Sequence, residues 1–176
     1  SLAGSRVSPP AHALRAIALE LERLANHTGD LGALAGDIGF LPTASYCGRL
    51  RGDFLNLTAL RCGRRLGRSF VRPGGVSFDV DSPRIRQCLE RLDAAYRDVA
   101  QAVKLLWNTP SVMARFEDTG RVPQDVAREL GLVGPAARAS GLRRDVRKTH
   151  PAGMYQFVHL PISTWESGDV FARAFV

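Results

Sequence analysis

Apolar residues recur with the spacing of a helix along the first part of the chain. Ser8 is a suitable helix cap, and the prolines at positions 9 and 10 suit the first helical turn because an N–H would be unpaired there. Gly39 follows the last periodic residue and can end the helix. We therefore predict a helix over residues 8–38 with one apolar face. Its residues are Leu14, Ile17, Leu21, Leu24, Thr28, Leu31, Ala35 and Ile38.

The second half of this helix lacks a solvated face. No Lys, Arg or Glu occurs between Leu24 and Phe40, and such a helix is usually buried. Glycines at 29, 32 and 36 each cost about 1 kcal/mol in a helix, which indicates that another backbone approaches closely. His27, Asp30 and Asp37 would then lie inside the packed body. The pattern leaves two interpretations open: a satisfied core histidine with paired or capping carboxylates, or a functional site.

Two further long helices are indicated by the same periodicity. Thr43 can cap a second helix that runs to about Cys62, and Asp81 with Pro83 can begin a third that ends before Pro110. Together with the first helix they predict a bundle core. The inner face of the second helix would hold Tyr46, Leu50, Phe54, Leu57 and Leu60. The seam of the third would hold Ile85, Leu89, Leu92, Tyr96, Val99, Val103 and Leu106.

The rest of the chain predicts shorter elements. Short helices are expected at residues 110–116, 123–130 and 168–176. A Pro-Gly-Gly turn at 73–75 interrupts an extended stretch, and residues 154–162, bracketed by prolines, are a strand candidate. The expected fold class is therefore mainly α, a helical bundle core with a few short strands, in a single domain over residues 1–176.

Composition narrows the class of protein and of site. The chain has 176 residues, 45% of them hydrophobic, and no apolar run reaches the ~18 residues of a membrane-spanning helix. No signal segment is apparent at the start. Three cysteines, at 47, 62 and 88, include no Cys-x-x-Cys pair, which argues against a disulfide framework or a self-contained metal site. We therefore predict no metal or other cofactor in this piece, and a reducing compartment.

Four blocks of sequence occur in a characteristic order. They are Leu-Glu-Leu-Glu-Arg-Leu-Ala-Asn-His at 19–27 with Gly-Asp at 29–30 and Ala-Gly-Asp-Ile-Gly at 35–39; Arg-Pro-Gly-Gly-Val at 72–76; Gly-Pro-Ala-Ala-Arg-Ala-Ser-Gly at 134–141 with Asp-Val-Arg-Lys at 145–148; and Gly-Asp-Val-Phe-Ala-Arg at 168–173. In this combination the chain resembles the large subunit of membrane-bound nickel-iron hydrogenases (group 4, formate-hydrogenlyase-like). It is similar to the related 49 kDa subunit of respiratory NADH:quinone oxidoreductase.

The resemblance implies a bundle of the hydrogenase large-subunit type and oxidoreductase chemistry. Asp37 would lie by the quinone or metal cavity with Asp30 in its vicinity, and His27 matches the family's helix histidine; Asp37 and His27 are the catalytic candidates. The parent complex would hold a nickel-iron centre or a quinone and would bind NAD. Its partners would be an iron–sulfur small subunit and other hydrogenase or dehydrogenase subunits. The residues expected at the interface with that small subunit and its clusters are Arg68, Arg72, Arg138 and Arg144.

The chain departs from the family pattern in two respects. The hydrogenase branch holds its metal with two Cys-x-x-Cys pairs, and neither is present, so the chain resembles a central fragment of a longer subunit that is inactive alone. Arg68 stands where the quinone-reducing branch has a histidine, and arginine does not release a proton at ordinary pH. This departure and the Gly-Asp-Leu-Gly-Ala-Leu sequence at 29–34 favour the hydrogenase branch.

Charge supplies the alternative function. The net charge of +7 and the arginine groups at 61–72 and 138–148 would suit a nucleic-acid-binding domain, although no helix-turn-helix signature or aromatic-and-basic stripe is evident. A non-catalytic interaction domain is the third interpretation. The resemblance instead predicts a cytoplasmic protein without a specific nucleic-acid partner, held at the membrane only through partner subunits.

Overall fold

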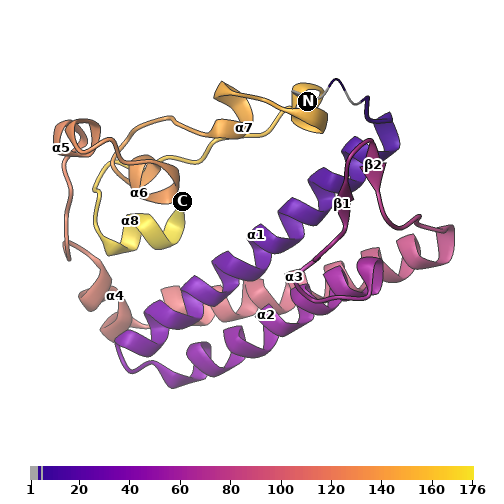
Figure 1. Cartoon of the computed structure of the whole chain (residues 1–176). Helices are drawn as coiled ribbons and strands as arrows, with labels where there is room; N and C mark the ends of the chain where they lie inside the picture. Colours follow the sequence, from indigo (N-terminus) through magenta and orange to yellow (C-terminus); the bar gives the residue numbers. More distant parts are fainter. Residues whose placement is uncertain (1–3, 5) are drawn as a thin grey trace. The chain divides into compact units, whose positions relative to one another are not determined.

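A computed structural model describes residue 4 and residues 6–176, and the chain divides into two compact units, Ser1–Leu106 and Trp107–Val176. The elements of the described residues are helical apart from one short hairpin, which confirms the mainly α fold (Figure 1). The single domain over residues 1–176 stays a prediction, and each unit is described by itself.

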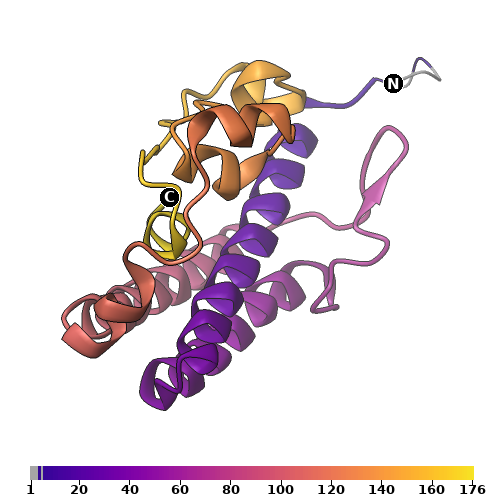
Figure 2. The ribbon, with the colours of Figure 1, turned by 90° about the vertical axis from the view of Figure 1, so that its left-hand side faces the viewer.

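The first unit is built on an antiparallel pair of helices, α1 (Pro9–Asp37) and α2 (Leu41–Cys62) (Figure 2). The connection is short because Gly39 adopts a positive φ of 76°, which lets the chain reverse within three residues. Gly63, with φ of 69°, ends α2 in the same way. The predicted cap at Thr43 is wrong, since this residue is buried inside α2, which starts two residues earlier.

The buried side of α1 is rotated from the predicted face. Leu21, Thr28 and Ala35 are buried as expected, but Ile17 and Leu24 are 41% and 40% exposed. The positions that replace them are small, because close packing against α2 requires small side chains. The buried seam runs through Leu21, Ala25, Thr28, Gly32 and Ala35.

A third helix, α3 (Ser82–Trp107), packs on this pair through small residues as well. The Asp81 carboxylate accepts a hydrogen bond from the backbone N–H of Arg84 at 2.9 Å and so caps the helix as predicted. Three of the seven predicted seam residues are exposed, namely Ile85 (43%), Leu89 (55%) and Tyr96 (72%), so the predicted seam is wrong at these positions. The observed core of the three helices contains Leu21, Ala25, Phe54, Leu57, Cys88 and Ala95, with Leu55, Leu92 and Val99 packed against it.

The segment between α2 and α3 forms a two-stranded hairpin, β1 (Val71–Arg72) and β2 (Gly75–Val76), with Val71 opposite Val76. Its turn is Pro73-Gly74, and Gly74 takes φ of 80°, as a type II turn requires. The guanidinium of Arg15 on α1 holds the hairpin by donating to the carbonyls of Arg72 and Gly75, at 2.7 and 2.8 Å.

The second unit consists of short helices joined by ordered loops. They are α4 (Pro110–Phe116), α5 (Gln124–Glu129), α6 (Gly134–Ala139), α7 (Val146–Thr149), the 3-10 helix η1 (Gly153–Gln156) and α8 (Val170–Phe175). The strand predicted over 154–162 is wrong, since the segment begins in η1 and continues without regular structure. Gly168 links two other segments of the unit through backbone hydrogen bonds. Its N–H donates to the carbonyl of Ala139, and its carbonyl accepts from the N–H of Val122. A Cβ there would lie 2.1 Å from the Val122 carbonyl oxygen, so only glycine fits.

Candidate functional site

Three ionisable residues follow one side of α1. At about 100° per residue, His27, Asp30 and Asp37 lie within about 80° of each other around the helix axis, and His27 and Asp37 are about 15 Å apart along it. All three are exposed in this chain, so the prediction that they lie inside a packed body is wrong for the described residues. The reason is that α2 packs on a neighbouring side of α1, through its small residues.

The contact between α1 and α2 is closest at Gly32. A Cβ built there would lie 2.9 Å from the Cβ of Cys47 and 3.4 Å from the carbonyl oxygen of Ala44. At Gly29 the side chain of Arg51 lies against α1, and a Cβ built on Gly29 would be 2.9 Å from the Cδ of Arg51. The glycines therefore do allow the close approach that the sequence predicted.

Beside this contact a groove of about 420 Å³ runs along the two helices. Asp30 is part of its wall, together with Asn26 and Arg51. The remaining wall is formed by small residues: Gly29, Gly32, Ala33, Ala44 and Gly48. The groove therefore offers one carboxylate, one amide and one guanidinium on a surface otherwise formed by backbone and methyl groups.

Asp37 is the last residue of α1 and precedes the turn into α2. The N–H of Phe40 donates to the carbonyl of Ala35 at 2.7 Å, and the N–H of Gly39 donates to that of Gly36 at 2.9 Å. These bonds fix the backbone on both sides of Asp37 while its side chain stays exposed. A carboxylate at a helix C-terminus faces the negative end of the helix dipole, which costs about 0.3–1 kcal/mol.

The four interface candidates belong to different units. Arg68, before the hairpin, and Arg72, within β1, are both exposed, and Nε of Arg72 donates to the hydroxyl of Ser77 at 2.6 Å. In the second unit Arg144 is exposed, whereas Arg138 is half-buried with Nη2 3.5 Å from the carbonyl oxygen of Val176.

Two buried carboxylates of the second unit are ordered, although sequence reasoning did not single them out as sites. Asp145 caps α7 and pairs with Arg147, with Nη2 to Oδ2 at 2.7 Å, and the Arg147 guanidinium lowers the pKa of Asp145 to about 2. Burial alone would raise the pKa of Asp169, but bonds from Ala172, Ser167 and Asp118 outweigh it and hold the pKa below its ordinary value. The sequence signal that could have found them is an aspartate directly before a short helix, a favoured capping position.

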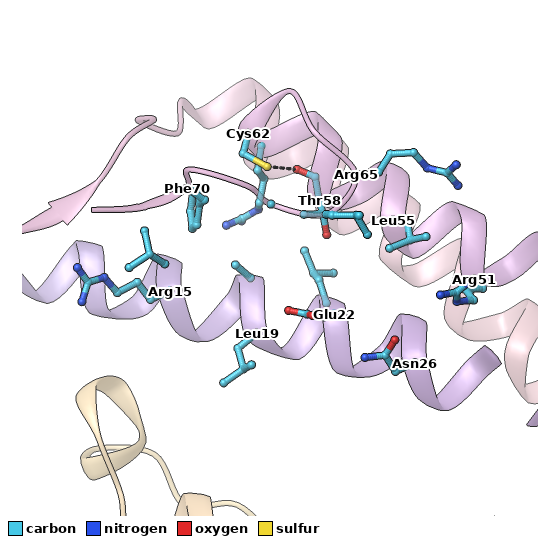
Figure 3. A pocket seen from close by; sticks show the side chains of 16 residues that line it. Arg15, Leu19, Glu22, Asn26, Arg51, Leu55, Thr58, Cys62, Arg65 and Phe70 are labelled. Atoms are coloured by element: carbon cyan, nitrogen blue, oxygen red, sulfur yellow. Dashed lines mark hydrogen bonds between the residues drawn. The ribbon is translucent and has the colours of Figure 1, made fainter. Parts of the chain in front are cut away.

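A second cavity, of about 210 Å³, lies between α1, α2 and the segment after α2 (Figure 3). Sequence reasoning did not predict this cavity. Arg61 lines it and is only 9% exposed. Arg61 lies in the last turn of α2, where a cation suits the helix dipole whether it is buried or exposed, so the sequence carries no signal of its burial.

The described part of the chain contains no group of three or more His, Cys, Asp or Glu side chains placed to hold a metal ion. Cys47, Cys62 and Cys88 are buried free thiols, and burial raises the pKa of Cys47. None of the helices among these residues is both long and apolar enough to cross a bilayer.

Comparison with known proteins adds the observation that decides the family. The sequence profile of the respiratory-chain NADH dehydrogenase 49 Kd subunit matches residues 37–176, most of the chain. The chain belongs to this family. Three of the four sequence blocks on which the resemblance rests, at 72–76, 134–148 and 168–173, lie within the matched residues, whereas the block at 19–39 lies mostly before them.

Relatives and a solved structure agree with this assignment. Subunit 4 of NADH-quinone oxidoreductase from Thermus thermophilus is 34% identical over 175 residues, which cover 99% of this chain and 43% of the relative. A chloroplastic NAD(P)H-quinone oxidoreductase subunit from Chlorokybus atmophyticus is 33% identical over 172 residues, 98% of this chain and 44% of the relative.

Among solved structures, a chain of the membrane-bound sulfane sulfur reductase, an archaeal respiratory membrane complex, superimposes with a TM-score of 0.90 at 26% identity. The match covers 98% of this chain and 47% of that one. The chain thus spans under half the length of the proteins it matches.

Proposed function

We propose that this chain is part of the large, 49 kDa-type subunit of a membrane-associated oxidoreductase complex. In that complex it contributes to electron transfer between an iron–sulfur small subunit and a quinone. The observation that carries the proposal is the family match over residues 37–176. The nearly complete structural agreement with a chain of a respiratory membrane complex supports it.

A quinone is better supported than a nickel-iron centre as the electron acceptor. Relatives at 33–34% identity are named quinone oxidoreductases, whereas the sequence features that favoured the hydrogenase branch are Arg68 and one short motif.

Asp37 is the residue we assign to the chemistry. Its carboxylate is unfavourable for helix stability at the end of α1, so the fold gives no reason for an acid there. It is exposed on a rigid turn, where it can reach a quinone or orient a histidine supplied by another part of the complex. His27 lies about 15 Å away along α1 and would act at a separate point, with Asp30 between them.

The arginine candidates would serve assembly rather than chemistry. Guanidinium groups form bidentate pairs with carboxylates of a partner. We propose that the exposed Arg68 and Arg72 make one such contact, and that the exposed Arg144 makes another beside the half-buried Arg138. The iron–sulfur small subunit is the proposed partner. The subunit would then be cytoplasmic and held at the membrane by its partners, and NAD would bind elsewhere in the complex.

Purification of the complex through a tag on this chain tests the proposal. We expect an iron–sulfur subunit to copurify, seen by its paramagnetic resonance spectrum on reduction, and the preparation to reduce a soluble quinone analogue. Arg144→Glu should lower the yield of the copurified subunit, whereas Arg86→Glu, the same change on α3, should not. Stoichiometric nickel with hydrogen evolution, or no copurified redox subunit, would contradict the proposal.

A further inference from the structure

The cavity beside Arg61 adjoins the groove at Asp30 and shares Asn26 and Arg51 with it, but it contains none of the candidate site residues. It is lined by residues of α1, of α2 and of the segment that follows α2, and His27, Asp30, Asp37, Arg68 and Arg72 are not among them (Figure 3). Most of its wall is apolar. The large apolar residues are Leu19, Leu21, Leu55, Leu66, Phe70 and Val71.

Arg61 is an unpaired cation in this apolar wall. Arg61 is only 9% exposed, and its Nε and Nη1 have no hydrogen-bond partner among the described residues. A buried charge without a partner is strongly unfavourable, so native proteins pair or neutralise it. Arginine keeps its proton at any ordinary pH, so the compensating charge must come from an anion.

The neighbouring charges do not supply that anion. Glu22 also lines the cavity, but no ion pair joins it to Arg61 in the described structure. Arg15 is occupied by the carbonyls of the hairpin, and Arg51 and Arg65 are further cationic residues of the wall. Four arginines against one glutamate give the cavity a positive potential.

We propose that this cavity binds a small amphiphile with an oxyanion headgroup, a carboxylate or a phosphate monoester, on Arg61 and its apolar tail against Leu55, Leu66 and Phe70. The guanidinium group suits both headgroups. The volume of about 210 Å³ lies below the about 300–1,000 Å³ of pockets for drug-sized ligands. A tail of medium length therefore fits. Quinone reduction does not require such a site, because a quinone headgroup is neutral.

Calorimetric titration of the full chain at constant ionic strength tests the proposal. The probes are octanoate and octyl phosphate, with acetate and octanol as controls that lack the tail or the charge. We expect one molecule of each anionic amphiphile to bind per chain. Acetate and octanol should each bind about tenfold more weakly or worse, since each loses one half of the interaction.

Variants separate a binding role of Arg61 from a structural one. Arg61→Met should weaken octanoate binding by about tenfold or more, while the ligand-free variant melts at the same or a higher temperature because an unpaired charge is removed. Arg86→Met, the same change of charge on an exposed part of α3, should leave binding unchanged. Glu22→Gln should strengthen it by removing a competing carboxylate. Arg61→Lys should retain weaker binding, and serves if the methionine variant does not fold.

Several results would overturn the proposal. One is the absence of saturable binding of both anionic amphiphiles. Another is equal binding of acetate or octanol, which would remove the amphiphilic character of the site. A third is a lower melting temperature of Arg61→Met with unchanged octanoate affinity, because Arg61 would then stabilise the fold without holding a ligand.

Discussion

At the scale of single residues, the carboxylate of Asp145 connects charge to stability. It accepts hydrogen bonds from the backbone N–H of Arg147 at 2.9 Å and from the guanidinium of the same residue at 2.7 Å. Both donors belong to one residue, so the carboxylate caps α7 and neutralises a cation at the same time. Since Asp145 is 9% exposed, water screens this pair little.

Asp145→Asn should lower stability only where the carboxylate is ionised. Arg147 lowers the pKa of Asp145 from 3.8 to about 2. The ionised group therefore adds about 2 kcal/mol above pH 4, a contribution that disappears as the pH falls through 2. We expect the variant to be less stable by about 2 kcal/mol at pH 7 and equal to the parent near pH 2.

Urea unfolding followed by tryptophan fluorescence measures this difference, because both tryptophans, Trp107 and Trp165, lie in the second unit. Asparagine can still accept from the N–H of Arg147, so the comparison isolates the charge. Glu129→Gln, at an exposed position of the same unit, is the matched control. A loss of stability that is constant from pH 7 to pH 2 would show that the charge of Asp145 is not responsible.

At the scale of elements, the packing of α1 on α2 depends on Gly32. A Cβ at this position would lie 2.9 Å from the Cβ of Cys47, whereas a Cβ at Gly48 of α2 would have no neighbour within 4 Å. Gly32→Ala should therefore destabilise the first unit by about 1–2 kcal/mol, because overpacking exceeds the gain in helix propensity. Gly48→Ala should instead stabilise it by up to about 1 kcal/mol.

Thermal unfolding followed by circular dichroism gives both values in one experiment. The two substitutions are chemically identical and both lie in helices, so an opposite sign isolates the contact between α1 and α2. Equal stabilisation by both would mean that the helices are farther apart than the structure has them.

The elements were predictable as far as local signals decide them. Proline and glycine at the ends of the long helices, and the capping Asp81, gave their number and approximate bounds. The buried seams were predicted less well, because periodicity favours large residues such as Leu89 and Tyr96, whereas close packing of helices selects small ones such as Ala95. The strand over 154–162 was wrong because its flanking prolines also suit an irregular loop.

The positions of the candidate residues along α1 were predictable, but their environment was not. The stripe of His27, Asp30 and Asp37 follows from helical spacing alone. Its exposure depends on which side of α1 contacts α2, and that is decided by tertiary packing at Gly32. The burial of Arg61 also depends on tertiary packing and could not be predicted. The last turn of a helix is usually solvated.

At the scale of the whole molecule, the net charge of +7 is the feature that raises the nucleic-acid alternative to the oxidoreductase assignment. If the arginines bound phosphates, affinity for DNA or RNA would fall steeply with salt. We expect only weak, non-specific binding that is absent at moderate salt, measured by fluorescence anisotropy with labelled oligonucleotides at several salt concentrations. Tight, sequence-selective binding at moderate salt would favour the alternative.

The central claim is that Asp37 belongs to the reaction site of a quinone-type complex. Its most direct test is the turnover of the assembled complex carrying Asp37→Asn, with Asp93→Asn on α3 as the control. An amide neither relays protons nor orients a histidine as a carboxylate does, so turnover should fall by about 10²-fold or more while the yield of assembled complex is unchanged. Near-normal turnover of the fully assembled Asp37→Asn complex would contradict the account.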